Sequence, residues 1–170
     1  LHLVLLTRKD PPLSLARLRA NSRLTEIRAA DLQFTQSEAG QLFNEMMDLS
    51  LPQADISALE ERTEGWIAGL HLAGLSIRGR DNPSTFIANL SGSHRFILSY
   101  LSEEVLKRQT EDVQHFLHQT SILERLNGDV CDAVTGRSNS SSLLEDLREA
   151  NLFLTPLDDE RHWYRSHGLF

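Results

Sequence analysis

The sequence is poor in lysine and cysteine, and it lacks a long apolar run. Lys9 and Lys107 are its only lysines, and 17 basic residues against 24 acidic ones leave a net charge of −7. Contacts to nucleic-acid or lipid phosphates need clustered positive charge. The balance therefore argues against a main role in holding DNA or an anionic membrane, and we expect any DNA-binding surface elsewhere in the parent protein.

Cys131 is the only cysteine, so no internal disulfide is possible, which favours a reducing compartment such as the cytoplasm. No apolar run approaches the roughly 20 residues that span a bilayer, and no charged segment precedes an apolar one at the start. These absences indicate neither membrane insertion nor secretion. The chain opens on Leu1 in an apolar run and stops at Phe170, so we expect both ends to be cut from a larger protein.

Catalytic and metal-binding motifs are also missing. Neither lysine follows a glycine, so the sequence has no G-x-x-x-x-G-K-[ST] loop to cradle nucleotide phosphates, and we expect no ATP hydrolysis by this chain alone. No serine, histidine and aspartate arrangement or carboxylate pair stands out. His115 and His118 lie three apart but lack a third ligand at a suitable distance, which favours ordinary helix histidines and predicts no metal site.

The first 34 residues predict a small α/β piece. Leu1 to Leu6 is typical of a buried parallel strand, and Pro12 suits the first turn of a following helix. Residues 24–28 indicate a second short strand. Arg8 follows the carboxyl end of the first strand, where open α/β sheets place ligand-binding residues and a guanidinium can pair with a phosphate; a plain surface arginine is the alternative.

Residues from Thr35 to about Asn151 predict a series of helices, so the fold is expected to be mainly α. Thr35 and Glu38 form a capping box, and Gly65 suits the left-handed end of a helix over 53–63. Further helices are expected over 66–78, from Asn82-Pro83 and over 95–109, with a subdomain boundary at 91–93. Apolar residues at helical spacing predict one buried face after Thr35, where the two methionines are core filler rather than a ligand box: Ala39, Leu42, Phe43, Met46 and Met47.

The last third predicts a winged helix. Helices are expected after Thr110, around 130–134 before Gly136, and over the stretch carrying Leu143, Leu144 and Leu147. Leu152 to Arg165 then indicates a β-hairpin whose turn is Asp158-Asp159-Glu160. An apolar strand ending in a magnesium-binding acidic pair is the alternative, but Pro156 interrupts it and acidic turns are common. His167, just after the hairpin, is a weak ligand candidate by chemistry alone.

Several segments of the chain resemble, in the same order, segments of the MalT-like, LuxR-type ATP-dependent transcription regulators. These regulators belong to the signal-transduction ATPases with numerous domains. The resemblance covers nearly the whole chain, and the segments that carry it are 3–20, 26–35, Thr63-Glu64-Gly65-Trp66-Ile67-Ala68-Gly69-Leu70, Gly92-Ser93-His94-Arg95, 120–123, 131–136, 151–154 and Tyr164-Arg165-Ser166-His167.

The resemblance implies the end of a P-loop ATPase core over 1–34, a helical subdomain over 35–92 and a winged helix over 93–170. Arg8 corresponds to the sensor arginine that reads the terminal phosphate, and His167 to the winged-helix histidine that touches the ADP phosphate in a closed state. Gly65, Trp66 and Ile67 correspond to the glycine-x-proline motif that packs on the nucleotide base, with Ile67 in place of proline. Ser166 and Gly168 also depart from residues that are often aromatic or histidine.

The implied cofactors are ATP and ADP, with magnesium in the intact parent. The resemblance implies that this parent is a slow ATPase that acts as a switch. The implied partners are other domains of the same chain and further copies in the ATP-bound state, with a small-molecule inducer and DNA bound through domains outside this chain. We therefore expect a nucleotide-sensing switch region of a transcriptional activator. A DNA-reading winged helix and a purely helical interaction scaffold are the alternatives; the first needs basic residues where Glu145, Asp146, Glu149 and the acidic turn stand.

Overall fold

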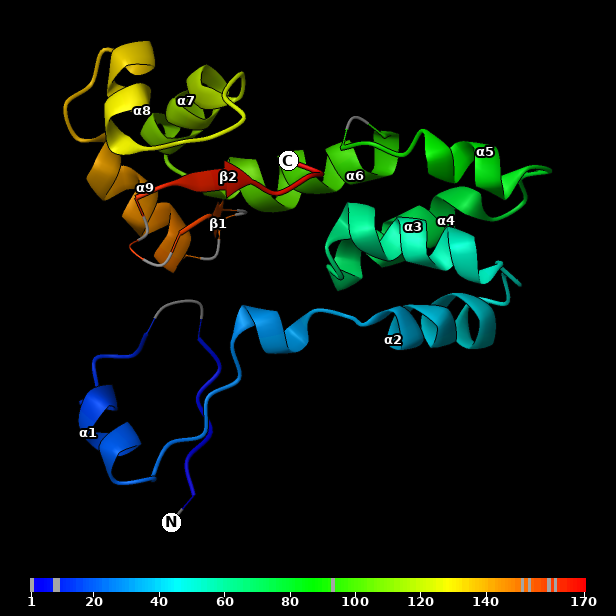
Figure 1. Ribbon diagram of the computed structural model, residues 1–170, viewed down its shortest axis with the longest axis horizontal. Coiled ribbons are helices and arrows are strands. Elements are labelled where there is room, and N and C mark those ends of the chain that lie inside the picture. The colour runs from blue at the N-terminus through cyan, green and yellow to red at the C-terminus, as the bar shows by residue number, and fades with distance from the viewer. Residues whose placement is uncertain are drawn as a thin grey trace. The chain divides into compact units, whose positions relative to one another are not determined.

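The computed structural model describes residues 2–7, 10–92, 94–150, 152, 154–158, 160 and 162–170. These residues form mainly helices and one two-stranded antiparallel sheet (Figure 1). In chain order, with η1 and η4 as 3₁₀ and η2 and η3 as π-helical segments, the elements are α1 (Leu15–Ala20), η1 (Ala29–Leu32), α2 (Gln36–Gly40), η2 (Gln41–Met46), α3 (Gln53–Thr63), α4 (Ile67–Ile77), α5 (Pro83–Ala88), α6 (Arg95–Tyr100), η3 (Leu101–Val105), η4 (Leu106–Arg108), α7 (Glu111–Thr120), α8 (Gly128–Thr135), α9 (Ser140–Glu149), β1 (Leu154–Pro156) and β2 (Tyr164–Ser166).

The chain divides into two compact units. Unit 1 comprises Leu1–Asp31 and His115–Ser166, and unit 2 comprises Leu32–Gln114 and His167–Phe170. The predicted domain limits at 34/35 and 92/93 stay a prediction. In the part of the chain that the structure describes, no helix is long and apolar enough to cross a membrane.

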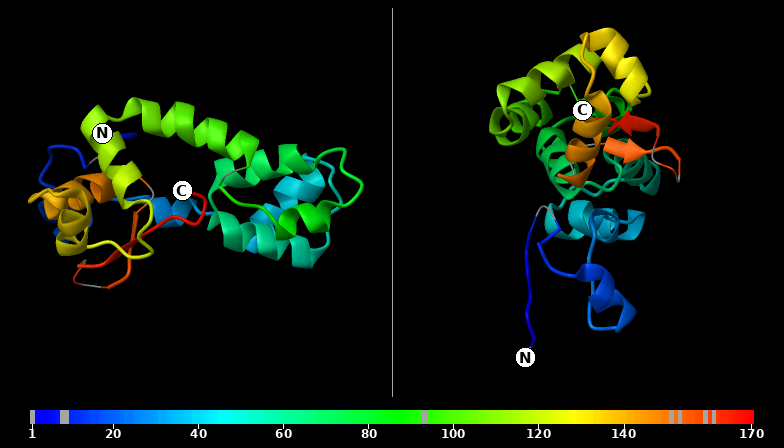
Figure 2. Two further views of the ribbon diagram at one scale, coloured as in Figure 1. Left: turned by 90° about the horizontal axis from the view of Figure 1, so that it is seen from above. Right: turned by 90° about the vertical axis from the view of Figure 1, so that its left-hand side faces the viewer.

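The predicted capping box starts helix α2 of unit 2. Glu38 N donates to Thr35 Oγ1 at 3.3 Å and Thr35 N donates to Glu38 Oε2 at 2.8 Å, which satisfies two backbone donors at the start of α2. Helix α3 packs against α2, α4 and α5, and α4 packs against α6 (Figures 1 and 2). The core of unit 2 comprises Ala39, Leu42, Phe43, Met47, Leu51, Ile56, Leu59, Leu70, Ala73, Ile77, Ile87, Leu90, Ile97, Leu101 and Leu169.

The structure corrects one predicted apolar face and one predicted helix of unit 2. Met47 is 6% exposed, as predicted for core filler, but Met46 is 79% exposed. Both lie at the end of η2, whose wider π turn shifts the side-chain positions away from regular helical spacing. The predicted helix 95–109 is likewise divided into α6, η3 and η4, and it buries Ile97 while Phe96 is 38% exposed.

Unit 1 contains the predicted hairpin. Strands β1 and β2 pair antiparallel with Leu154 opposite Ser166 and Pro156 opposite Tyr164. Asp158 closes the turn, because its carboxylate accepts from His162 N at 2.8 Å and Trp163 N at 2.9 Å. Helix α9 packs against α8 and β1 around a small core of Phe116, Leu126, Cys131, Leu144, Leu147 and Tyr164. Burial raises the pKa of the Cys131 thiol to about 11.

The strands predicted at 1–6 and 24–28 are not formed by the described residues, so that prediction is wrong for them. A parallel strand needs neighbouring strands for its backbone groups, and no such partner occurs among the described residues; Leu6 is 98% exposed. The following helix begins at Leu15 rather than at Pro12. Asn151, expected to end a helix, lies outside the described residues.

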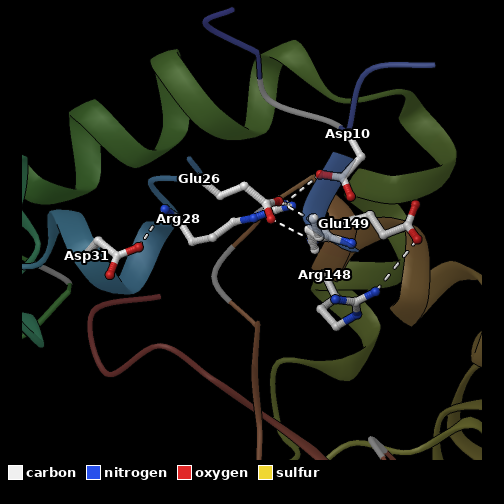
Figure 3. A network of polar contacts seen from close by, with 7 residues as sticks. Asp10, Glu26, Arg28, Asp31, Arg148 and Glu149 are labelled. Atoms are coloured by element: carbon white, nitrogen blue, oxygen red, sulfur yellow. Dashed lines mark hydrogen bonds and ion pairs between the residues drawn. The ribbon is translucent and has the colours of Figure 1, made fainter. Parts of the chain in front are cut away.

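Ion pairs rather than a sheet hold the segment around Arg28. Its guanidinium contacts Asp10 at 2.6 Å and also Glu26, while its backbone N–H donates to Asp31 at 2.8 Å (Figure 3). Hydrogen bonds from Arg19, and then from Arg28, lower the pKa of Glu26 to about 2. Because these groups are exposed, solvent screens the pairs and each adds little to stability.

The neighbouring methionines provide a matched stability test. We expect Met47→Ala to lower the free energy of unfolding by about 2–5 kcal/mol, because it leaves a cavity against α4; a Cβ on Gly74 would lie only 2.6 Å from the Met47 sulfur. Met46→Ala should change the free energy of unfolding by less than about 0.5 kcal/mol, because the Met46 side chain is exposed. Urea unfolding followed by circular dichroism measures both, and equal losses would contradict the assigned burial.

Candidate functional site at the 63–66 turn and the C-terminal tail

The candidate site lies where the chain reverses between α3 and α4. Thr63 ends α3, and the next two residues adopt left-handed backbone angles, φ +50° at Glu64 and φ +68° at Gly65. Glycine is required at 65 for a second reason, because a Cβ there would lie 2.6 Å from Phe34 O. The backbone N–H of Phe34 also donates to Gly65 O at 2.8 Å. The turn is therefore fixed by local geometry as well as by its neighbours.

The C-terminal residues 167–170, called the tail below, return to this turn. His167 Nε2 lies 3.0 Å from Thr63 O, 104 residues earlier in the chain, and Leu169 N donates to His167 Nδ1 at 3.1 Å. A nitrogen that accepts from an N–H carries no proton, so Nε2 carries it and donates to the carbonyl. The neutral Nε2–H tautomer is the form that satisfies both contacts.

The rest of the tail is held by backbone and apolar contacts. Gly168 N donates to Glu64 Oε1 at 3.1 Å, and Leu169 is 3% exposed. Leu169 lies directly on two glycines: a Cβ on Gly92 would be 2.0 Å from Leu169 O, and one on Gly69 would be 3.1 Å from its Cδ1. Small residues at these positions let the tail approach the helices of unit 2.

Aromatic rings form one side of the site. Trp66 meets the His167 ring edge-on, with centroids 6.1 Å apart and planes at 75°, and meets the Tyr100 ring at 5.6 Å and 62°. Trp66 N donates to Thr63 O at 2.9 Å, so this one carbonyl accepts from both the tryptophan backbone and the histidine ring. Ile67, the first residue of α4, is 40% exposed.

The structure brings together only some of the predicted nucleotide-site residues. Trp66 and His167 are in ring contact, and Gly65 and Ile67 flank Trp66 along the turn. Arg8 lies outside the described residues, so its predicted phosphate contact stays a prediction. Sequence reasoning assigned no role to Thr63, Glu64, Gly92 or Leu169, although the first three lie inside the segments that carry the family resemblance.

The arrangement can hold residues 167–170 against the rest of unit 2, but the described residues offer no nucleophile and base pair here. Both ring nitrogens of His167 already serve contacts within the protein. Among the described residues, no group of three or more histidine, cysteine or carboxylate side chains is placed to hold a metal ion. Of the residues predicted to meet a nucleotide, Trp66 has a ring that can stack, and His167 has a ring N–H that could donate only in place of its bond to Thr63 O.

Gly92→Ala tests the packing of the tail. Overpacking costs about 1–3 kcal/mol, and here the added methyl meets the backbone of Leu169. We expect hydrogen exchange at Gly168, Leu169 and Phe170 to accelerate roughly tenfold or more. Gly40→Ala is the matched control, because its Cβ would make an ordinary 3.8 Å contact with Ile56. Unchanged tail exchange in Gly92→Ala would show that the tail is not held against Gly92.

Comparison with known proteins shows what this chain is similar to. Residues 102–170 match the MalT winged helix domain. The whole chain is 36% identical over 170 residues to PknK of Mycobacterium tuberculosis, named a serine/threonine-protein kinase, and covers 15% of it. Over 174 aligned positions it is 34% identical to the HTH-type transcriptional regulator MalT of Yersinia enterocolitica and to that of Yersinia pestis, covering 19% of each.

The chain thus spans less than a fifth of the length of these relatives, and the match extends from its first residue to its last. The winged-helix match includes α7, α8, α9, both strands and the tail with His167. The turn at 63–66, to which the tail returns, precedes that match but lies within the full-length similarity. This chain thus carries a match to the MalT winged helix domain over residues 102–170, and over its whole length it is similar to MalT regulators and to PknK.

Proposed function

We propose that this chain is the nucleotide-sensing switch region of an ATP-dependent transcriptional activator. In this role it couples the ADP or ATP state of the parent protein to oligomerisation and activation of transcription. Similarity to proteins named transcriptional regulators supports the regulatory part. The parent would act in the cytoplasm, with inducer and DNA bound by domains outside this chain.

The observation that carries the proposal is the contact of His167 with the 63–66 turn. The imidazole lies at the end of the winged-helix match, yet it hydrogen-bonds Thr63 O and touches the Trp66 ring. Residues far apart in the sequence are thereby joined by a few hydrogen bonds and one buried leucine. Such a contact is small enough to break and re-form, as a two-state element requires.

Each predicted nucleotide residue has a role in this proposal. Arg8 reads the terminal phosphate, the Gly65-Trp66-Ile67 turn packs on the base, and His167 touches the ADP phosphate in the closed state. ATP and ADP are the ligands, with magnesium in the intact parent. The chain alone hydrolyses no ATP, because its sequence has no phosphate-cradling loop.

The alternative of a DNA-reading winged helix is disfavoured by the charges of α9. Arg148 is the only basic residue of that helix, and its guanidinium pairs with Glu145 and approaches Glu149 at 3.6 Å. A recognition helix needs available donors for base edges and phosphates. We therefore expect no nanomolar, sequence-dependent binding of duplex DNA at physiological salt.

An electrophoretic mobility shift series with promoter and scrambled duplexes measures this. The double variant Glu145→Gln/Glu149→Gln should strengthen weak, sequence-independent binding of duplex DNA, because it frees Arg148 and removes two negative charges. A sequence-dependent shift by the unmodified chain would overturn the assignment.

His167 and Arg8 should act in opposite directions in the full-length parent. His167→Ala should destabilise the closed, ADP-bound state by about 1.5–3 kcal/mol, the value of a charge-assisted hydrogen bond, and raise basal activity. Arg8→Ala should weaken discrimination between ATP and ADP and lower inducer-dependent activation, because a ligand shifts a population only by its differential affinity.

Nucleotide titration calorimetry and sedimentation, with and without inducer, measure both effects. Thermal unfolding of each variant shows whether the fold itself is destabilised. His118→Ala, which removes a histidine from α7, is the control substitution. The nucleotide roles are wrong if both stably folded variants behave like the parent. A helical scaffold would show no nucleotide dependence at all.

A further inference from the structure

A second group of aromatic and basic side chains lies on unit 2, away from the tail contacts. Its members, called the arginine-aromatic row below, are Arg80, Phe86, His94, Arg95 and Phe96. The Arg80 guanidinium carbon lies 4.2 Å from the Phe86 ring centroid, and that of Arg95 lies 4.7 Å from the Phe96 centroid. His94 lies between the two rings, at 4.9 Å from Phe86 and 6.0 Å from Phe96.

The basic groups of the row have no carboxylate partner among the described residues. Elsewhere in the chain Arg19, Arg28, Arg108 and Arg148 each pair with an acid. Here the two guanidinium groups face rings and, for Arg80, the Ser76 carbonyl at 2.7 Å. Burial, and then the charges of Arg80 and Arg95, lower the pKa of His94. A chain of net charge −7 thus carries here two arginines that pair with no carboxylate among the described residues.

Hydrogen bonds hold the row in position. The Ser76 hydroxyl donates to Leu72 O at 2.7 Å, so its oxygen accepts from His94 Nδ1 at 3.3 Å. Arg80, which follows α4, donates from Nε to Ser76 O in the last turn of that helix at 2.7 Å. Stacking on phenylalanine limits the remaining freedom of each guanidinium, which lowers the entropy lost when a ligand binds.

We propose that the arginine-aromatic row is a docking surface for an acidic protein segment that bears carboxylates and at least one aromatic side chain. Arg80 and Arg95 are exposed and offer planar N–H pairs that match carboxylates, and the half-exposed Phe86 and Phe96 rings offer apolar contact. Inorganic phosphate would leave these rings unused. A nucleic acid would be repelled by the net charge of the whole chain.

The position of the row supports an extended partner. Its residues come from three places in the chain: Arg80 follows α4, Phe86 lies in α5, and His94 to Phe96 begin α6. The row therefore follows the ends of three packed elements rather than one helix face. An extended segment can meet several such points in succession, with carboxylates and rings alternating along it.

The test uses the full 170-residue chain and a fluorescein-labelled peptide of alternating glutamate and phenylalanine. We expect saturable binding by anisotropy at 0.15 M salt, and Arg80→Gln/Arg95→Gln should weaken it about tenfold or more, since two charge-assisted hydrogen bonds are lost. Lys107→Gln/Arg108→Gln makes the same change in net charge elsewhere on unit 2. It should weaken binding less than about twofold, because distant exposed charges are screened.

Amide chemical-shift changes should centre on residues 76–96. Circular dichroism establishes that each variant is folded; if the double variant unfolds, the exposed Arg95→Glu alone should still abolish binding. Equal loss in both double variants, binding of the lysine version of the peptide, or displacement by millimolar phosphate would overturn the proposal. So would a change of oligomeric state on Arg80→Gln/Arg95→Gln, which would assign the surface to contacts between copies.

Discussion

The carbonyl oxygen of Thr63 is the point on which the geometry of the candidate site depends. It accepts from Trp66 N within the turn and from His167 Nε2 in the tail, so one acceptor fixes both a local reversal and a contact across 104 residues. The oxygen is available because the two following residues turn left-handed and take α3 no further. Without that reversal the last carbonyls of α3 would continue a helical ladder, and His167 would have no acceptor at this position.

The distribution of arginine partners separates the two surfaces of interest. On α9 the only arginine is neutralised by neighbouring acids, which leaves an acidic helix where a DNA reader would need positive charge. On unit 2, Arg80 and Arg95 stack on phenylalanine rings, which hold a guanidinium in place without cancelling its charge. An arginine paired with a carboxylate is already satisfied, whereas one stacked on a ring keeps donors for a partner.

Local signals were sufficient for part of the fold. The Thr35 capping box, the left-handed Gly65, the helix end before Gly136 and the hairpin turn at Asp158 each depend on contacts within a few residues, and each was predicted. The strands predicted at 1–6 and 24–28 are not formed by the described residues. A strand is stabilised by neighbouring strands, and the local sequence pattern does not show whether such neighbours are present. Met46 was misplaced because a π turn changes helical spacing. The tail site escaped spacing arguments, since its contacts join residues about a hundred positions apart. Chemistry alone made His167 only a weak ligand candidate, and the family resemblance gave it a specific role.

The hydrogen bonds of His167 also limit what the proposed switch can do. A phosphate oxygen could accept the Nε2 proton only in place of Thr63 O, since one N–H directed at two acceptors weakens both contacts. Protonation of Nδ1 would give the ring a positive charge suited to phosphate, but it would remove the acceptor that Leu169 N now uses. In either case the ring meets phosphate only by giving up part of its hold on the tail. A nucleotide contact of the proposed kind would therefore compete with the present tail geometry for one imidazole, which is the property that a two-state element needs.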